Sequence, residues 1–223
     1  MKPCIVIPAH NEARTIGQLI HQLKNKNLDA VVIDDGSSDP TGSVAKEQGA
    51  VVLTHEKKKG KGASLRDGFT YALAHDFDGV ITMDGDLQHA VEDIDQFISK
   101  AKDSPASVIT GTRMNNPQGM PKIRLLTNRV MSGMISSLCR QKIPDTQCGF
   151  RYIGREVLEN IQCFSCDFEI ETEVLVKASR KGFPIHSVPI RTIYRNETSK
   201  INPALDTFRF LLYIIKETWR TKP

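Results

Sequence analysis

Short apolar runs alternate with amphipathic stretches through the first half of the chain. The apolar runs are rich in Val and Ile, which is typical of strands buried on both faces of a sheet. They predict strands at 4–7, 30–33, 51–53, 80–83 and 108–110. Between them, apolar residues at helical spacing predict helices at 15–24, 41–48, 62–74 and 91–101. This alternation predicts an α/β, Rossmann-like fold with a mostly parallel sheet and helices on both faces.

The second half of the chain has a less regular pattern. It predicts a loop at 115–121, a helix at 122–139, a compact turn at 145–151, a helix at 168–181, a strand-like run at 185–194 and a last helix from 202 to about 219. No internal repeat, low-complexity segment or long linker divides the chain. We therefore expect a single domain over 1–201, followed by an amphipathic C-terminal helix over 202–223.

Polar clusters follow three of the predicted strands, and the carboxyl ends of parallel strands meet at one edge of a sheet. The strongest cluster is Asp84-Gly85-Asp86, with Gln88 two residues further on. Two carboxylates around a glycine, with an amide oxygen nearby, suit a divalent cation that also binds phosphate oxygens. The alternative is a solvated acidic turn, which is the commoner role of an isolated pair of this kind. The other strand ends favour the metal interpretation.

Those other strand ends carry groups that suit a nucleotide. Asp35 follows the second strand, where an acidic residue of a nucleotide-binding fold accepts hydrogen bonds from a ribose or a base. Ser37 and Asp39 also suit helix capping, which is the alternative role for both. Lys61 lies between two glycines at the start of a helix, where an anionic diphosphate is favoured. Neither a P-loop nor a G-x-G-x-x-G turn is present, so a dinucleotide cofactor is not expected.

Taken in order, these motifs resemble a known family. They are Ile5–Glu12, Asp34–Asp39, Gly60-Lys61-Gly62, Asp84–His89, Gly111-Thr112-Arg113, Asp145–Arg151, Phe168-Glu169 and Ser199-Lys200. The sequence resembles the family 2 glycosyltransferases of GT-A type, and it is most similar to their dolichol-phosphate mannosyltransferase-like branch. The resemblance extends from residue 5 to about 201. Several motifs in one order are far more specific than any one of them.

The resemblance implies an inverting transfer from a nucleotide sugar, either GDP-mannose or a UDP-sugar. By position, the nucleotide-sugar site comprises Pro8, Ala9, Glu12, Asp35, Lys61, Asp84, Gly85 and Asp86. The resemblance also implies that Asp84, Asp86 and Gln88 surround Mg²⁺ or Mn²⁺ together with the donor diphosphate. The resemblance divides the domain into a nucleotide-binding half at about 1–114 and an acceptor half at about 115–201.

The branch also implies a polyprenyl or dolichyl phosphate as acceptor. A phosphate monoester is already anionic at pH 7, so it needs cations to hold it rather than a base. The expected acceptor-phosphate residues are Arg113, Arg124, Asn128, Arg151 and Lys200, and the expected catalytic residues are Asp86, Arg113, Arg124 and Asp145. If the acceptor is instead a saccharide or another hydroxyl, Asp145 is the candidate base. Otherwise Asp145 orders its turn.

A third hypothesis is a non-catalytic subunit that binds a nucleotide sugar. The intact pair Asp84 and Asp86 argues against it, because such a subunit needs no metal carboxylates. An essential Asp145 with a dispensable Arg113 and Arg124 would instead favour a hydroxyl acceptor. The sequence identifies neither the sugar nor the oligomeric state.

Composition and charge mainly exclude classes of partner and location. The formal net charge of +4 is too small to indicate a nucleic-acid partner. No apolar run reaches the roughly 18 to 20 residues of a membrane span, and no export signal is evident, so we expect a cytoplasmic protein with five reduced cysteines. The segment 202–223 combines an apolar stripe with Arg and Lys. It predicts peripheral attachment to the cytoplasmic face of a membrane or to a small membrane-anchoring subunit. The alternative is that it packs on the catalytic domain itself.

Overall fold

A computed structural model describes residues 1–114, 120–191 and 193. Its strands are β1 (Pro3–Ala9), β2 (Ala30–Asp34), β3 (Val51–Thr54), β4 (Gly79–Thr82), β5 (Val108–Thr112), β6 (Arg151–Gly154) and β7 (Ile185–Pro189). Its helices are α1 (Ile16–Asn25), α2 (Thr41–Glu47), α3 (Lys61–Ala74), η1 (Val91–Asp93), α4 (Ile94–Asp103), α5 (Lys122–Cys139), α6 (Arg155–Asn160) and α7 (Glu169–Arg180).

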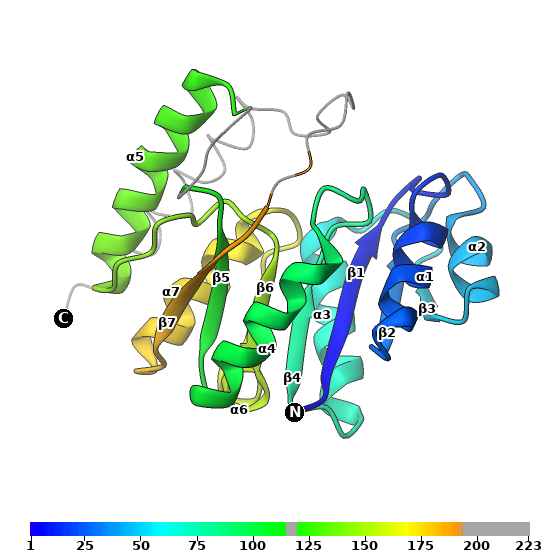
Figure 1. Cartoon of the computed structure of the whole chain (residues 1–223), viewed down its shortest axis with the longest axis horizontal. Coiled ribbons are helices and arrows are strands. Elements are labelled where there is room, and N and C mark those ends of the chain that lie inside the picture. The colour runs from blue at the N-terminus through cyan, green and yellow to red at the C-terminus, as the bar shows by residue number, and fades with distance from the viewer. Residues whose placement is uncertain (115–119, 192, 194–223) are drawn as a thin grey trace.

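The strands form one sheet in the order β3-β2-β1-β4-β6-β5-β7. All neighbouring pairs are parallel except those of β6, which lies antiparallel between β4 and β5. The register pairs Val6 with Val31 and with Thr82, so β1 is bonded along both edges. The carboxyl ends of the parallel strands therefore share the upper edge of the sheet in Figure 1.

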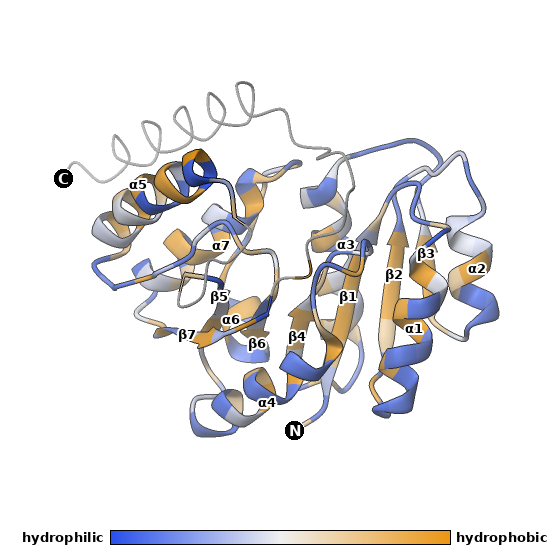
Figure 2. Ribbon diagram, turned by 45° about the horizontal axis from the view of Figure 1, so that its top comes forward, coloured by the Kyte–Doolittle hydropathy of each residue, from blue (hydrophilic) through white to orange (hydrophobic). Residues whose placement is uncertain are grey.

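Two apolar cores lie on the two faces of this sheet. Successive side chains of a strand point to opposite faces, so Cys4 and Val6 join one core while Ile5 and Ile7 join the other. The first core is completed by α3, α5, α6 and α7, and the second by α1, α2 and α4. Apolar residues fill the central strands, and the outward faces of α1, α2 and α4 are largely polar (Figure 2). Because each helix buries one stripe on the sheet, the cores fix the strand ends that carry the polar clusters.

The observed fold confirms the predicted α/β class and the mostly parallel sheet with helices on both faces. Each element predicted in the first half is present within a few residues, except that 91–101 is divided into η1 and α4. Two elements of the second half were not predicted. Arg151, placed at the end of a turn, opens β6, and α6 follows immediately. The strand-like run at 185–194 ends as β7 at Pro189.

Some sequence predictions lie outside the described residues. These are the loop residues 115–119, the end of the strand-like run, the candidate Lys200 and the C-terminal helix. Within the described ranges, no helix is both long and apolar enough to cross a bilayer. All five cysteines are in these ranges, and each is a free thiol, as predicted.

Candidate active site

The polar loops that follow β1 and β2 are bonded to each other at the carboxyl edge of the sheet. The Asn11 backbone N–H donates to Ser37 Oγ at 2.9 Å, and the Asn11 side chain accepts from the Ser38 N–H at 2.8 Å. The Glu12 N–H donates to Thr41 Oγ1 at 2.8 Å. Asn11 has a left-handed backbone, with φ 57°, that allows this approach. The expected donor residues of β1 and β2 therefore share one edge of the fold.

The turn Asp84-Gly85-Asp86 leaves β4 next to Glu12. A Cβ placed on Gly85 would lie 3.3 Å from Glu12 Cγ, so the glycine lets the first loop approach the turn closely. Burial and the neighbouring Asp84 carboxylate raise the pKa of Asp86 to about 6. Leu87 then adopts φ 60°, a strained conformation for a residue with a bulky side chain. A crowded carboxylate pair on a strained turn is typical of a functional site.

Lys61 connects this turn to the second half of the chain. Its Nζ lies 2.6 Å from Asp84 Oδ1 and 2.9 Å from Glu171 Oε1. Burial alone would raise the pKa of Asp84, but the Lys61 ammonium lowers it to about 2. A Cβ on Gly149 would lie 2.9 Å from Glu171 Oε1 and 3.0 Å from Lys61 Nζ. Gly149 therefore leaves space for three charged groups, from α3, from the turn after β4 and from α7, to meet.

Glu171 is a site residue that the sequence analysis missed. It lies in the first turn of α7, where an acidic residue is also explained by the helix dipole. Its distance from Asp84 along the chain gave no sign that one lysine would bond both. The nearest signal in the sequence was the motif Phe168-Glu169, which begins three residues before Glu171. In the structure this motif also lies beside Lys61, since the Phe168 ring centroid is 5.5 Å from Lys61 Nζ.

Asp35 takes a different set of partners from the ribose or base predicted for it. Oδ1 accepts hydrogen bonds from His55 Nδ1 and the Lys59 N–H, both at 2.7 Å, and Oδ2 accepts from the Gly60 N–H at 2.9 Å. Burial would raise the pKa of Asp35, but these backbone and histidine hydrogen bonds lower it. The carboxylate thus orders the lysine-rich loop against β2, and its role toward a nucleotide stays a prediction.

The glycines on either side of Lys61 let another segment of the protein pack closely against the start of α3. The Gly62 N–H donates to the Cys166 carbonyl at 2.6 Å, and the Ala63 N–H donates to the same oxygen at 3.2 Å. A Cβ on Gly60 or Gly62 would lie 2.4 to 2.6 Å from this segment. The first N–H groups of α3 are therefore capped by the loop 163–167. The sequence led us to expect a diphosphate at these N–H groups, and in the structure two of them instead donate to a backbone carbonyl.

That loop is held to α7 by Glu173, whose side chain is 4% exposed. Glu173 accepts from the Phe164 and Ser165 N–H groups at 3.0 and 2.8 Å and pairs with Lys177 at 2.7 Å. Burial would raise the pKa of Glu173, but these hydrogen bonds lower it. A lowered carboxyl pKa stabilises the fold above the unfolded-state value near ~4.3, and this stability is lost as the pH falls through the folded-state pKa.

We therefore expect E173Q to lower the free energy of unfolding by about 1–3 kcal/mol at pH 7, because a charged acceptor of buried N–H groups is lost. The difference from the wild type should shrink as the pH falls below about 4. Urea unfolding followed by circular dichroism at several pH values measures both. The control E159Q removes a carboxylate that is 49% exposed and should cost well under ~1 kcal/mol. A pH-independent cost for E173Q would contradict this account.

On the acceptor side, Asp145 and Arg113 form a buried ion pair. Arg113 Nε and Nη2 donate to the two Asp145 oxygens at 2.8 and 2.9 Å, and Asn128 Nδ2 donates to Oδ1 at 3.1 Å. The Asp145 and Arg113 side chains are 0% and 10% exposed. Burial would raise the pKa of Asp145, but Arg113 and Asn128 hold it below its usual range. The pair fixes the plane of the guanidinium at the end of β5.

The remaining acceptor candidates are placed differently. Arg124 is exposed in the first turn of α5. Arg151 is 2% exposed, and its guanidinium donates to the carbonyls of Thr146, Cys148 and Glu171. These three hydrogen bonds to backbone carbonyls order the turn 145–150. Arg151 therefore has a structural role in this turn, and its role toward an acceptor phosphate stays a prediction.

The carboxylates fit a divalent cation only in company with a substrate. In the part of the chain that the structure describes, no three His, Cys, Asp or Glu side chains are grouped as a metal site. Mg²⁺ sites at nucleotides commonly use one or two carboxylates and complete their shell with phosphate oxygens and water. Asp84 and Asp86 supply two such carboxylates, and the Lys61 cation beside Asp84 shows that this corner attracts positive charge. Gln88 follows the same turn, with its N–H on Asp86 Oδ1 at 3.0 Å.

Comparison with known proteins gives the class of the protein. Residues 4–162 match the model of the family described as "Glycosyl transferase family 2". Glucosyl-3-phosphoglycerate synthase from Mycobacterium tuberculosis, solved with Mn²⁺ and UDP-glucose, has the same fold, with a TM-score of 0.73. It is 20% identical, and the match covers 96% of this chain and 78% of that one. The chain therefore belongs to glycosyl transferase family 2 and is a glycosyltransferase with a GT-A fold.

Two curated relatives indicate the branch of the family to which this chain is similar. The chain is 29% identical over 213 residues to the UDP-N-acetylglucosamine–dolichyl-phosphate N-acetylglucosaminyltransferase of Methanococcus voltae, with 85% of each protein covered. It is 27% identical over 200 residues to the polyprenol monophosphomannose synthase of Mycolicibacterium smegmatis, with 83% of this chain and 75% of the relative covered. These relatives confirm the resemblance to the dolichol-phosphate branch.

Proposed function

We propose that this enzyme transfers a sugar, with inversion, from a nucleotide sugar to a polyprenyl or dolichyl phosphate. The observation that carries the proposal is the buried pair of Arg113 and Asp145. A carboxylate that accepts two guanidinium hydrogen bonds and one amide hydrogen bond is a weak base, and its partner is a fixed cation. Such an acceptor site suits a group that is already ionised. The names of the two curated relatives support the same acceptor class.

The donor occupies the carboxyl edge of the sheet in this proposal. Pro8, Ala9 and Glu12 line the nucleotide, and Lys61 neutralises charge on the donor diphosphate as the leaving group departs. Mg²⁺ or Mn²⁺ on Asp84 and Asp86, with Gln88 nearby, would supply further neutralisation of the diphosphate. Glu171 positions Lys61 and keeps it charged, because burial alone would lower the lysine pKa while the two carboxylates raise it.

The acceptor phosphate is itself the nucleophile. A phosphate monoester has a second pKa near ~6, so it is largely dianionic at pH 7 and attacks the anomeric carbon without a base. One of its oxygens bonds to that carbon as the bond to the diphosphate breaks. Arg113 and Arg124 hold the phosphate, since guanidinium groups match phosphate oxygens in geometry. Asn128 is buried against Asp145 and acts in this scheme by positioning Asp145.

The proposal also gives the two halves of the domain their roles. Residues at about 1–114 bind the donor, and residues at about 115–201 bind the acceptor. Because a polyprenyl chain stays in a lipid bilayer, the enzyme works as a peripheral protein at the cytoplasmic face of a membrane. The runner-up, a hydroxyl acceptor with Asp145 as base, is disfavoured by the lowered pKa of Asp145.

Release of nucleoside diphosphate tests the function directly. The purified 223-residue protein is given Mg²⁺ or Mn²⁺ and a panel of GDP- and UDP-sugars, with and without a short, water-soluble polyprenyl phosphate. We expect release from one donor only when the lipid phosphate is present. Release that needs a saccharide and ignores every lipid phosphate would replace the proposal with the hydroxyl-acceptor alternative.

In the same assay, we expect R124A to raise the KM for the lipid phosphate at least about tenfold, because one charge-assisted contact to a phosphate is lost. The affinity for the nucleotide, measured by calorimetry, should change less than about twofold. R129A is the matched control, since Arg129 is exposed on the same helix and lies on a different side of it. Equal losses of acceptor and nucleotide affinity in R124A would show that Arg124 has another role.

A further inference from the structure

The outer face of α5 is apolar and exposed. Ile123, Leu126, Val130 and Met134 are 76%, 63%, 55% and 38% exposed. Their spacing of three and four residues places them in one stripe along the helix. The buried residues of α5 form the opposite stripe, which packs toward the body of the protein. A Cβ on Gly133, beside the stripe, would meet no atom of the described residues within 4 Å.

The charges around the stripe have one sign. The 18 residues of α5 include Lys122, Arg124 and Arg129 and contain no carboxylate. All three cations are exposed. At 100° per residue, Lys122 and Arg129 flank the apolar stripe on one side, and Arg124 lies on the other. An apolar stripe bordered by cations matches an anionic lipid surface, where the apolar side chains enter the interface and the cations meet the headgroups.

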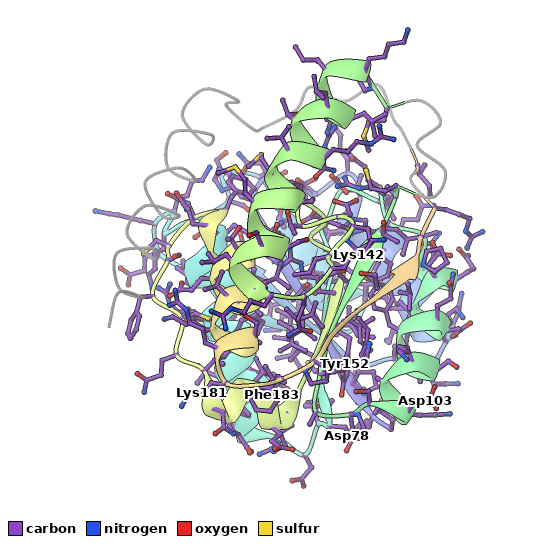
Figure 3. The ribbon with its side chains drawn as sticks, turned by 90° about the vertical axis from the view of Figure 1, so that its left-hand side faces the viewer. Asp78, Asp103, Lys142, Tyr152, Lys181 and Phe183 are labelled. Atoms are coloured by element: carbon purple, nitrogen blue, oxygen red, sulfur yellow. The ribbon has the colours of Figure 1, made fainter. Side chains whose placement is uncertain are left out.

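The position of α5 adds a second argument. The amino end of the helix rises above the carboxyl edge of the sheet, where the candidate site lies (Figure 1). Viewed from its own side, α5 runs along the front of the molecule (Figure 3). Arg124 is one residue from Ile123, so a phosphate held by Arg124 lies near the start of the apolar stripe. A lipid phosphate sits at headgroup depth, and the surface beside its binding group must therefore face the bilayer.

We propose that the stripe of Ile123, Leu126, Val130 and Met134 is a docking surface for an anionic lipid bilayer. The inference rests on the proposed lipid-phosphate acceptor and assigns the face that meets the membrane. Other occupants fit the charges less well. A symmetric contact between two copies would bring the same cations together. Residues 202–223 carry four basic and two acidic residues, so they add positive charge to a surface that is already positive.

The test is co-sedimentation of the 223-residue protein with vesicles of phosphatidylcholine, with and without phosphatidylglycerol, and without any substrate. We expect binding to the anionic vesicles only. L126S/V130S should weaken it at least about tenfold, through loss of apolar burial. K122E should weaken it about 25-fold, at about fivefold for each unit of charge. V51S, at the far edge of the sheet, and K102E, at the end of α4, are the controls and should bind as the wild type does.

Transfer to the short, water-soluble acceptor, measured without vesicles, separates this inference from the proposed function. L126S/V130S should keep the wild-type turnover there, because neither residue is in the site. Turnover without any vesicle binding would overturn the docking surface and leave the proposed function standing. Vesicle binding that both L126S/V130S and K122E retain would overturn it as well. A change in the molar mass of L126S/V130S in light scattering would also overturn it, because the stripe would then join two copies of the chain. Vesicle binding lost in these variants, with no transfer to any lipid phosphate, would support the surface and contradict the acceptor.

Discussion

D86N should lower the turnover number at least about 10²-fold while the folded protein becomes no less stable. The activity falls because one of two carboxylates available to a cation at the donor diphosphate is replaced by a neutral amide. The stability is kept because Asp86 repels Asp84 and Glu12 at the end of β4. Removing one of these like charges should leave the melting temperature of the metal-free protein equal to or above that of the wild type.

Nucleoside diphosphate release measures the turnover, and differential scanning fluorimetry measures the melting temperature. Asparagine keeps the side-chain oxygen that accepts the Gln88 N–H, so the turn should hold its shape. D76N is the matched control, because Asp76 is exposed after α3 and should affect neither quantity. Full turnover in D86N would exclude Asp86 from metal binding. Lost turnover together with a much lower melting temperature would mean that the carboxylate supports the fold instead.

The sequence was sufficient for elements that carry a repeated apolar pattern. The buried strands of the first half are recognisable in the sequence as short runs of Val and Ile, and their helices follow at regular intervals. The β6 strand, at Arg151–Gly154, was not recognisable in this way, because it begins with an arginine and follows a polar turn. Only the tertiary structure buries that arginine, by giving its guanidinium three carbonyl partners. A local pattern cannot show that.

Some residues of the candidate site could likewise be predicted from the sequence, and others could not. Asp84 and Asp86 could be found because both lie in one motif directly after a strand. Glu171 could not, since it meets Asp84 only through Lys61, and the three come from separate parts of the chain. Likewise, the sequence did not show that Arg113 and Asn128 both donate to the Asp145 carboxylate. Motifs therefore predict the candidate site, and only the contacts between distant elements show which side chains meet in it.

The pair of Arg113 and Asp145 yields the second large expected effect. R113M should lower the free energy of unfolding by about 3–5 kcal/mol, because it leaves the Asp145 carboxylate buried without its cation. D145N should also be destabilising, since it leaves the guanidinium without its counter-charge. In the double variant, the second substitution should cost much less than it does alone, with a coupling energy of about 2 kcal/mol or more.

Urea unfolding at pH 7 for the wild type, both single variants and the double variant measures this coupling. The control cycle is K26M and D95N, a surface pair whose atoms lie only 2.6 Å apart but whose carboxylate is 68% exposed. That cycle should give a coupling below ~1 kcal/mol, since solvent screens the pair. Equal couplings in the two cycles would contradict the buried ion pair.

The same two variants decide between the proposed roles of Asp145. If Asp145 positions Arg113 for an anionic acceptor, D145N and R113M disable the same interaction, and the two losses of kcat/KM should be similar and not additive. If Asp145 is instead a base for a hydroxyl, D145N alone should abolish turnover, while R113M keeps it and shifts its acid limb to higher pH, because the carboxyl pKa rises once the cation is gone. The pH profile of kcat/KM for R113M therefore separates a positioning carboxylate from a catalytic one, even if both variants fold less stably.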